Sequence, residues 1–174
     1  MPVNFTSSKE VFLRRLKTLH MVNCGLTNLD VSSWNFPSLE SLIVSHNQLI
    51  AIPVGLGKFR SLTNLNIDYN QIECLDFCKF KGLDNLKHLS VGHNKLQELI
   101  AGDSTLLASL ISLKLNFNRL EDVEALPQQD LPALESLDLS GNNLPWCQTY
   151  DLFLGTGKKF ALYANPFNCS DEIE

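Results

Sequence analysis

Asparagine recurs along this chain at a nearly fixed interval of 23 or 24 residues, and this period constrains the fold more than any other feature. Cysteine occupies the first place in the series, and a partial seventh copy follows the last full one. The positions are Cys24, Asn47, Asn70, Asn94, Asn118, Asn142 and Asn165. A period of this length is typical of proteins that stack one small unit, or rung, on the next, and not of a closed globule.

Apolar residues flank each asparagine in the same arrangement. In the second rung, Leu39, Leu42 and Val44 lead to Asn47, and Leu49 follows it. Apolar and polar residues alternate around Leu42 and Val44, which is the pattern of a strand with one buried face. We expect the strands of successive rungs to lie parallel and about 4.8 Å apart. The matching segments are 16–26, 39–49, 62–72, 86–96, 110–120 and 134–144, with a remnant at 160–167.

These segments follow the pattern L-x-x-L-x-L-x-x-N-x-L, and over residues 13–169 the chain resembles the leucine-rich repeat family. The resemblance implies an α/β-type solenoid, an arc with a parallel β-sheet on its concave face, with about six full repeats and a short C-terminal cap. We expect an N-terminal segment or partial cap at 1–12, repeats at 13–146 and a capping segment at 147–174.

Each asparagine has a physical task. A buried turn leaves backbone groups unpaired, and an Asn side chain both donates and accepts, so it can satisfy the backbone of its own rung and the next. Cysteine does this poorly, so we expect Cys24 to be a buried free thiol in a less regular first rung. Two further apolar columns are expected to fill the core from the convex side. They are Leu13, Phe36, Phe59, Leu83, Leu107, Leu131 and Leu154, and Leu29, Ile52, Leu75, Leu99, Val123 and Cys147.

Composition argues against some classes of function. The net charge of -5 argues against a nucleic-acid partner, which requires a basic stripe. No stretch approaches 18 consecutive apolar residues, so we expect no membrane insertion. Residues 1–12 lack the apolar run of a signal peptide and make a poor cap. They either belong to a mature or truncated segment of a longer protein or form the minimal cap of a short native one.

Apart from Cys24, the cysteines form two pairs. Cys147 and Cys169 occupy nearly the same place on adjacent rungs, whose spacing is close to the roughly 5.5–6 Å between disulfide-bonded α-carbons. We expect a bridge that closes the C-terminal end; the alternative is two buried thiols. Cys74 and Cys78 lie four residues apart on the convex side. They either pair with each other, bind an external thiol or stay free.

Two N-glycosylation sequons, at residues 4–6 and 168–170, make Asn4 and Asn168 predicted glycosylation sites. Together with the expected disulfide they favour a secreted, extracellular protein. The alternative is a cytoplasmic protein, in which the two C-terminal cysteines are reduced packing residues.

The outward-facing residues of the strands form the predicted recognition surface, because strands line the concave face and every second side chain points away from the core. All four histidines fall on this face, and aromatic or histidine residues run beside the asparagines. Aromatic residues are enriched among interface anchors, so we expect a protein partner. The predicted partner-binding residues are His46, Asn66, Asp68, Tyr69, His88, His93, Lys114, Asn116 and Phe117.

Two interpretations of the histidines stay open. Histidine titrates near neutral pH, so the cluster fits a pH-sensitive or metal-dependent patch. In leucine-rich repeats, however, the position before the asparagine is commonly His, Tyr, Phe or Ser, and such side chains simply cover the edge of the strand. The sequence contains no motif for catalysis, phosphate binding or metal ligation, so we expect no enzyme activity, no cofactor and no metal.

The C-terminal part resembles a narrower group. Residues 134–153 run from the last full repeat through Cys147 into a short amphipathic stretch, and residues 160–169 end at Cys169. This arrangement is similar to the C-terminal cap of secreted insect (mosquito-type) leucine-rich repeat immune proteins, which act in complement-like defence. The resemblance implies a protein-recognition module of innate immunity. The alternatives are a fragment of a Toll-like or adhesion-type receptor ectodomain, and an intracellular scaffold or regulatory subunit.

Overall fold

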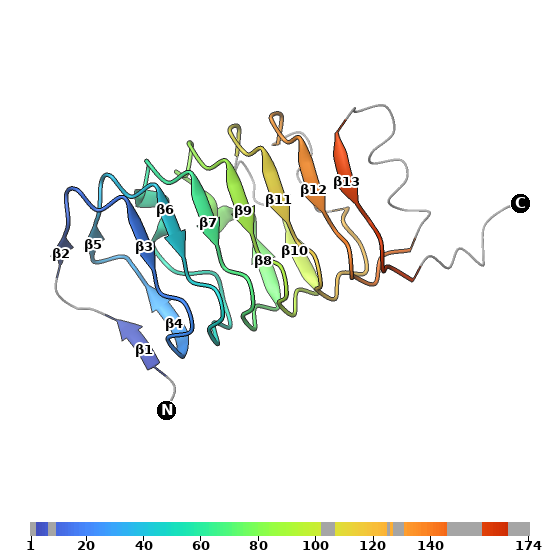
Figure 1. The fold of residues 1–174 in the computed structure, drawn as a ribbon, viewed down its shortest axis with the longest axis horizontal. Coiled ribbons are helices and arrows are strands. Elements are labelled where there is room, and N and C mark those ends of the chain that lie inside the picture. The colour runs from blue at the N-terminus through green and yellow to red at the C-terminus, as the bar shows by residue number, and fades with distance from the viewer. Residues whose placement is uncertain are drawn as a thin grey trace, which may run out of the picture.

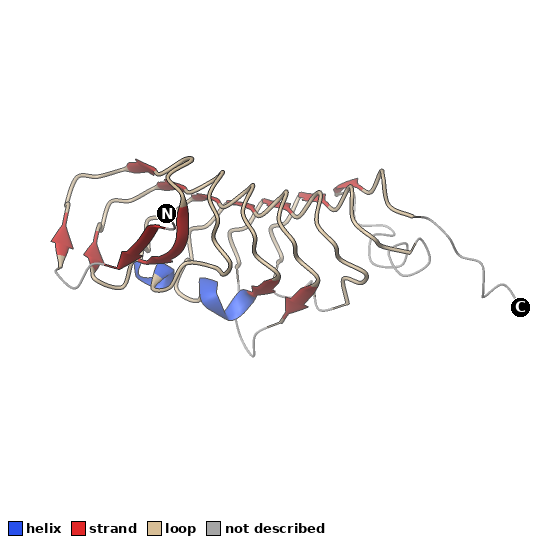
Figure 2. Ribbon diagram, turned by 90° about the horizontal axis from the view of Figure 1, so that it is seen from below, coloured by secondary structure: helices blue, strands red, loops and turns tan. Residues whose placement is uncertain are grey.

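The computed structural model describes residues 3–6, 10–101, 107–124, 126, 131–145 and 158–166. The chain coils so that each turn adds one short strand to a seven-stranded parallel sheet (Figure 1). Figure 2 shows these strands along one side of the coil. From the N-terminal end they are β3 (Thr18–His20), β6 (Ser41–Ile43), β7 (Asn64–Asn66), β9 (His88–Ser90), β11 (Ser112–Lys114), β12 (Ser136–Asp138) and β13 (Lys159–Ala161).

The strands pair without offset, so the central residue of each strand lies beside the central residue of the next. Leu42 pairs with Leu19 on one side and with Leu65 on the other, and Leu89 pairs with Leu113. A slip of one residue would turn every leucine from the core to the solvent. The regular period therefore fixes the register, and the predicted solenoid with a parallel sheet is confirmed.

The opposite, convex side of the coil consists of short strands and 3-10 turns. A repeat this short leaves room there for very little helix, so the helical part of the predicted α/β solenoid is 3-10 in the described residues. The two 3-10 helices are η1 (Leu56–Lys58) and η2 (Phe77–Phe80). The strand pairs are β1 (Val3–Thr6) with β4 (Leu26–Asp30), β2 (Val11–Phe12) with β5 (Trp34–Asn35), and β8 (Cys74–Asp76) with β10 (Glu98–Ile100).

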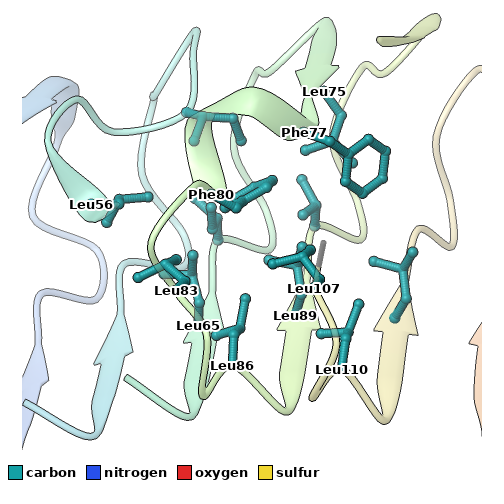
Figure 3. Packing of buried hydrophobic residues seen from close by; sticks show 14 of the residues in the cluster. Leu56, Leu65, Leu75, Phe77, Phe80, Leu83, Leu86, Leu89, Leu107 and Leu110 are labelled. Carbon is teal, nitrogen blue, oxygen red and sulfur yellow. The ribbon is translucent and has the colours of Figure 1, made fainter. Parts of the chain in front are cut away.

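A contiguous hydrophobic core fills the coil between its two sides. In Figure 3, Leu65 and Leu89 approach this core from the sheet, and Phe77 and Phe80 approach it from η2. All four side chains are fully buried. No rung can bury its leucines alone, so the stability of the coil comes from contacts between neighbouring rungs.

The two convex-side columns predicted from the sequence are buried, with one exception among the described residues. That exception is Leu13, whose side chain is 46% exposed, whereas the equivalent Phe36 of the next rung is 4% exposed. The prediction of a buried Leu13 is wrong because no rung precedes it in the described structure to cover its outer surface. Leu154 and Cys147 lie outside the described residues.

A ladder of asparagine side chains satisfies the backbone where each rung turns away from its strand. The Asn94 amide donates to the carbonyl oxygens of Val91 and Gly92 in its own rung, at 3.2 and 3.1 Å. It also donates to Ile67 in the preceding rung at 3.1 Å, and its oxygen accepts from the Ile72 N–H at 3.1 Å. Each asparagine therefore serves its own rung and the preceding one, and not the next one as predicted. The same bonds recur at Asn47, Asn70, Asn118 and Asn142.

This geometry explains the cysteine at the start of the series. Cys24 is exposed, so the prediction of a buried thiol is wrong. An asparagine at this place would have no preceding rung to bond to within the described structure. The backbone N–H of Cys24 is itself satisfied, because it donates to the side-chain oxygen of Asn47 at 2.8 Å. The first rung therefore needs no asparagine of its own.

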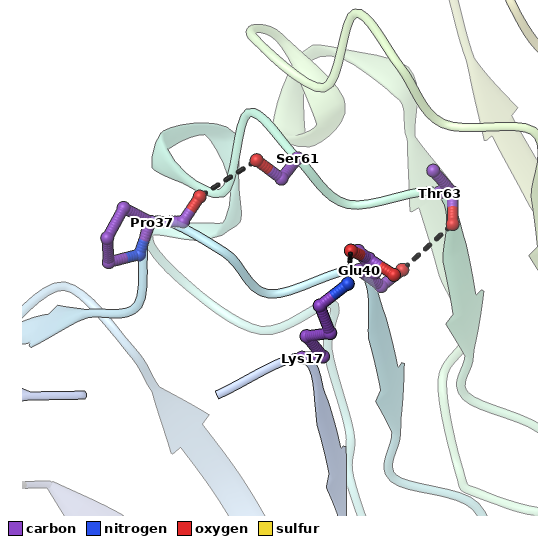
Figure 4. Close-up of polar contacts among 5 residues, drawn as sticks. All are labelled: Lys17, Pro37, Glu40, Ser61 and Thr63. Atoms are coloured by element: carbon purple, nitrogen blue, oxygen red, sulfur yellow. Dashed lines mark hydrogen bonds and ion pairs between the residues drawn. The ribbon is translucent and has the colours of Figure 1, made fainter. Parts of the chain in front are cut away.

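Polar side chains also connect neighbouring rungs before the strands (Figure 4). The hydroxyl groups of Ser61 and Thr63 donate to the backbone oxygens of Pro37 and Glu40, at 2.8 and 3.0 Å. Lys17 and Glu40 form an ion pair at 2.8 Å, but both side chains are largely exposed, so water and salt screen it. The two hydroxyl hydrogen bonds join each side chain to the backbone of the preceding rung, so they contribute more to the alignment of the coil than the ion pair does.

Candidate recognition surface

The predicted partner-binding residues fall in three rows on the side of the coil that carries the sheet, here called the sheet face. The first lies within the strands and includes two register positions, because Asn66 and Lys114 both pair with Ser90, whereas His88 pairs with Ser112. The second lies two residues after a strand, and the third stands directly before the ladder asparagines. None of these side chains is buried, so the fold collects them on one exposed surface. The rows are Asn66, His88 and Lys114; Asp68 and Asn116; and His46, Tyr69, His93 and Phe117.

The third row forms a continuous stack of rings across four rungs, here called the ring stack: His46, Tyr69, His93 and Phe117. Successive ring centroids lie 4.2, 4.2 and 4.6 Å apart, and the planes of successive rings differ by 9°, 7° and 18°. Neighbouring strands are about 4.8 Å apart, so the repeat itself places each ring over the next. Favourable aromatic pairs contribute about 0.5–1.5 kcal/mol each beyond the area that they bury.

The backbone turns all four ring-stack residues in the same direction. Each has a left-handed conformation, with φ between 53° and 56°. This conformation disfavours side chains with a Cβ atom by roughly 1–2 kcal/mol, and stacking offsets that cost. Gly141 occupies the same place in the sixth rung, where a Cβ atom would lie 2.5 Å from Cδ1 of Phe117. The ring of Phe117 therefore covers the glycine, and the stack ends there.

The ring stack offers a partner its edges rather than its faces. Tyr69 and His93 have a ring on either side, so their faces are already in contact with protein. Tyr69 and Phe117 nevertheless remain 44% and 43% exposed. A cation bound over an aromatic ring needs an open face, and the inner rings provide none. The exposed edges, with the Tyr69 hydroxyl and the imidazole nitrogens, suit hydrogen bonds and apolar edge contacts.

Hydrogen bonds between rungs hold a second part of this surface. The Asp68 carboxylate accepts from the Ser90 hydroxyl at 2.7 and 2.9 Å and from the Gly92 N–H at 2.7 Å. The side-chain oxygen of Asn66 accepts from the Asp68 N–H at 2.9 Å. A Cβ atom on Gly92 would lie 2.6 Å from Oδ1 of Asn116, so the Asn116 side chain fills the space above the glycine. These polar residues therefore shape the surface as well as line it.

The sheet face carries few charges. Of the outward-facing residues in the seven strands, the charged ones are Lys114, Asp138 and Lys159. The Asp138 carboxylate accepts from the hydroxyl and the N–H of Ser140, at 2.6 and 3.1 Å. Contacts on this face would therefore depend mainly on hydrogen bonds and apolar edges.

The sequence predicted where the rings lie but not that they stack. Their constant place directly before each asparagine was the signal that could have predicted the stacking.

The convex-side cysteines are separate from the sheet face. Cys74 is half-buried, Cys78 is exposed, and both are free thiols. Burial raises the pKa of the Cys74 thiol, and the neighbouring carboxylates of Glu98 and Asp76 raise it further. Within the described part of the chain, no three His, Cys, Asp or Glu side chains lie close enough together to hold a metal ion.

The predicted disulfide and glycosylation sites remain predictions. Cys147, Cys169 and Asn168 lie outside the described residues. Asn4 lies in β1, where it pairs with Asn28 of β4.

The fold and its exposed face define a class of protein: a solenoid of short parallel strands, tied together by an asparagine ladder. Among the residues described, no helix has the length and apolar composition that crossing a bilayer requires. The chain belongs to the leucine-rich repeat family. The model for "Leucine rich repeat" matches residues 14–72 and 60–120, and a model for two copies of the repeat matches 108–147. Repeats of this family generally bind protein partners.

Similar proteins include much longer chains. Transforming growth factor beta activator LRRC32 of Mus musculus is 36% identical over 121 residues, which cover 69% of this chain and 15% of that protein. Lumican of Gallus gallus is 36% identical over 108 residues, which cover 60% of this chain and 31% of lumican. The structure of the LRIM1/APL1C complex has a TM-score of 0.64 at 22% identity and covers 93% of this chain and 30% of that chain. That last likeness concerns the fold alone.

Proposed function

We propose that this chain is a non-enzymatic, extracellular recognition module that binds a protein partner through its sheet face, with the ring stack at the centre of the contact. The observation that carries the proposal is the continuous exposed surface formed by four stacked rings and their polar neighbours on a single in-register sheet.

The chemistry of this surface supports a protein partner. Tyrosine, serine and asparagine are abundant on surfaces that recognise proteins, because they combine apolar contact with adaptable hydrogen bonding. The ring stack and the bonds of Asp68 to Ser90 and Gly92 hold the surface in one conformation before binding. A rigid surface loses little conformational entropy on association. The name of the relative LRRC32 describes an activator of a growth factor, which is consistent with a protein as the partner.

The extracellular part of the proposal rests on the two sequons and on a bridge between Cys147 and Cys169. The similarity of the C-terminal residues to caps of insect immune proteins supports a role in innate immunity. Two other functions compete: part of a membrane-receptor ectodomain, and an intracellular scaffold or regulatory subunit.

Counting free thiols in denaturant tests the compartment. Of the five cysteines, Cys24, Cys74 and Cys78 are free in the structure, so a secreted chain with one bridge yields three free thiols. Five free thiols in the protein purified from its native source would contradict secretion and favour the intracellular alternative.

A matched pair of charge reversals tests the surface. Lys114→Glu changes an exposed residue of β11, and Arg60→Glu changes an exposed residue away from the sheet strands, with the same change in net charge. Proteins captured from native extracellular fluid by each variant and by the original chain are quantified by mass spectrometry. The dissociation constant of a captured protein is then measured by calorimetry with the purified components.

We expect Lys114→Glu to weaken that complex by about tenfold and Arg60→Glu to weaken it by less than about twofold, because only Lys114 lies on the sheet face that contacts the partner. Equal affinities for the original chain and both variants would contradict binding through the sheet face.

A further inference from the structure

The ring stack contains two side chains of a type that changes charge near neutral pH. His46 and His93 lie on opposite faces of Tyr69, and each imidazole centroid is 4.2 Å from the centroid of the tyrosine ring. Histidine side chains generally gain a positive charge as the pH falls through the range from about 8 to 5. Acidification therefore brings positive charge to the centre of the sheet face, which otherwise carries few charges.

The stack itself tolerates this charge. A cation is attracted to the face of an aromatic ring, and the planes of the two imidazoles differ from that of Tyr69 by only 9° and 7°. His93 also lies 4.6 Å from the ring of Phe117 on its other side. His46 is exposed and His93 is half-buried, so both rings keep contact with water that hydrates the charge. Protonation should therefore leave the fold intact and act on what binds to the ring edges.

The neighbouring residues offer no free carboxylate to pair with the charge. Among the described turns and strands around the stack, the one carboxylate is that of Asp68, which accepts from the Ser90 hydroxyl at 2.7 and 2.9 Å and from the Gly92 N–H at 2.7 Å. Lys95 adds a positive charge, and its Nζ donates to Oε1 of Gln71 at 3.2 Å. These segments are 18–26, 41–49, 64–72, 88–96 and 112–120, and their other charged or titratable side chains are His20, Cys24, Tyr69, His88, Lys114 and Arg119.

We propose that protonation of His46 and His93 releases the partner from the sheet face, so that the chain binds at neutral pH and lets go in acid. This inference rests on the function proposed above. A neutral imidazole presents one donor and one acceptor at its edge, whereas the protonated ring presents two donors and a charge. A partner that covers these edges removes their water, and a buried charge without a counter-charge costs far more than a buried neutral group. The partner therefore binds the neutral stack.

The same chemistry specifies the partner's side of the contact. Neutral ring edges carry no charge, so a carboxylate placed against them would be buried without a counter-charge. A partner that fits the neutral stack instead offers amide, hydroxyl or apolar groups, and none of these neutralises an imidazolium. The contact therefore loses free energy when the rings are protonated.

Two double variants and the original chain test this proposal. His46→Phe with His93→Phe removes both titrating groups and keeps a ring at each place, as Phe117 does in the fifth rung. His20→Phe with His88→Phe is the matched control, because it removes two exposed histidines of the same face outside the ring stack. The probe is a protein that the original chain captures from native extracellular fluid and that Lys114→Glu captures less well. Calorimetry measures its dissociation constant at pH 7.5 and at pH 5.5, and circular-dichroism melts at both pH values monitor the fold.

A site that binds only when one typical histidine is neutral loses about tenfold in affinity between these pH values. We therefore expect the dissociation constant to rise by at least about tenfold at pH 5.5 for the original chain and the control. For the ring-stack variant it should rise by less than about twofold. Only this ratio is compared, so a change of affinity at neutral pH does not enter. The melting temperature should respond to pH equally in the original chain and in the ring-stack variant.

An equal rise in all three proteins, or a rise that is lost in the control instead of the ring-stack variant, would overturn the proposal. So would tighter binding of the original chain at pH 5.5, or a melting temperature that falls in acid only when both ring-stack histidines are present. Capture that Lys114→Glu does not weaken would contradict the proposed function, and this inference with it. Binding through the sheet face with equal affinity at both pH values would overturn this inference alone.

Discussion

The first and fourth rungs carry the same sequence pattern, but they lie in different surroundings. Leu89 in the fourth rung is fully buried, and Asn94 bonds to its own rung and to the one before it. In the first rung, Leu19 is only partly buried, and Cys24 stands exposed where an asparagine would otherwise be. The repeated pattern therefore stabilises the fold through contacts between rungs, so the same residue type contributes different amounts of free energy at different places in the array.

The largest expected effect is at the central leucine of the strand. Leu89→Asp places an unpaired charge in the core and should destabilise the fold by more than about 4 kcal/mol, which the circular-dichroism melt would show as loss of the folded transition. Leu19→Asp places the same charge at a partly exposed site and should cost less than half as much. Equal melting temperatures for the two variants would contradict the claim that a leucine of the first rung stabilises the fold less than its equivalent in the fourth.

The asparagine ladder gives the next largest effect. Asn94→Ala leaves buried backbone groups of two rungs without partners and should cost about 2–3 kcal/mol in urea unfolding. Cys24→Ala should change stability by no more than about 0.5 kcal/mol, because its thiol is exposed. Cys24→Asn should not stabilise the fold. A gain of stability from Cys24→Asn similar to the loss from Asn94→Ala would show that an asparagine at position 24 finds hydrogen-bond partners, which contradicts the explanation given for Cys24.

The ring stack gives a smaller effect. Tyr69→Ala removes two stacked contacts and should cost about 1–2 kcal/mol in the same unfolding experiment. Tyr69→Gly should be less destabilising than Tyr69→Ala, because glycine adopts the left-handed φ of 55° without strain. Asn23 has the same φ in the first rung, and Asn23→Ala serves as the control for backbone strain without stacking. If Tyr69→Ala costs no more than this control, stacking contributes nothing.

The smallest effect is chemical. Burial and the carboxylates of Glu98 and Asp76 raise the pKa of the Cys74 thiol, so less of it is thiolate at any pH below that pKa. Alkylation of Cys74 should therefore be slow at pH 8, accelerate as the pH rises, and become faster at pH 8 in Glu98→Gln. Peptide mapping by mass spectrometry measures the rate at each cysteine. The rate at the distant Cys24 should not respond to Glu98→Gln, and a lower rate at Cys74 in this variant would contradict the assignment.

Much of the fold could be predicted because the sequence repeats its constraint. The recurrence of residues equivalent to Leu42 and Asn47 determines strand, register and stacking together, and a slip at one rung would be opposed by every other rung. The errors at Leu13 and Cys24 share one cause. Burial at those two positions depends on a preceding rung, which the described structure does not contain. The pattern within one rung does not indicate whether another rung covers it.

The candidate site was predicted less completely. The position of His46, Tyr69, His93 and Phe117 followed from their constant place in the repeat. Their stacking depends on the left-handed backbone before each asparagine, which aims successive rings in one direction. The role of Asp68 as an acceptor for Ser90 and Gly92 was also missed, because spacing gives the neighbourhood of a side chain but not its bonds.

Amide hydrogen exchange in Asn94→Ala tests the direction of the asparagine ladder most directly. The Ile72 N–H donates to Asn94, whereas the Leu96 N–H donates to Asn118 at 3.0 Å. We predict that the variant loses at least about tenfold of the protection of Ile72 relative to Leu96, because only Ile72 loses its acceptor. Retained protection at Ile72 together with lost protection at Leu96 would contradict a ladder in which each asparagine binds the rung before it.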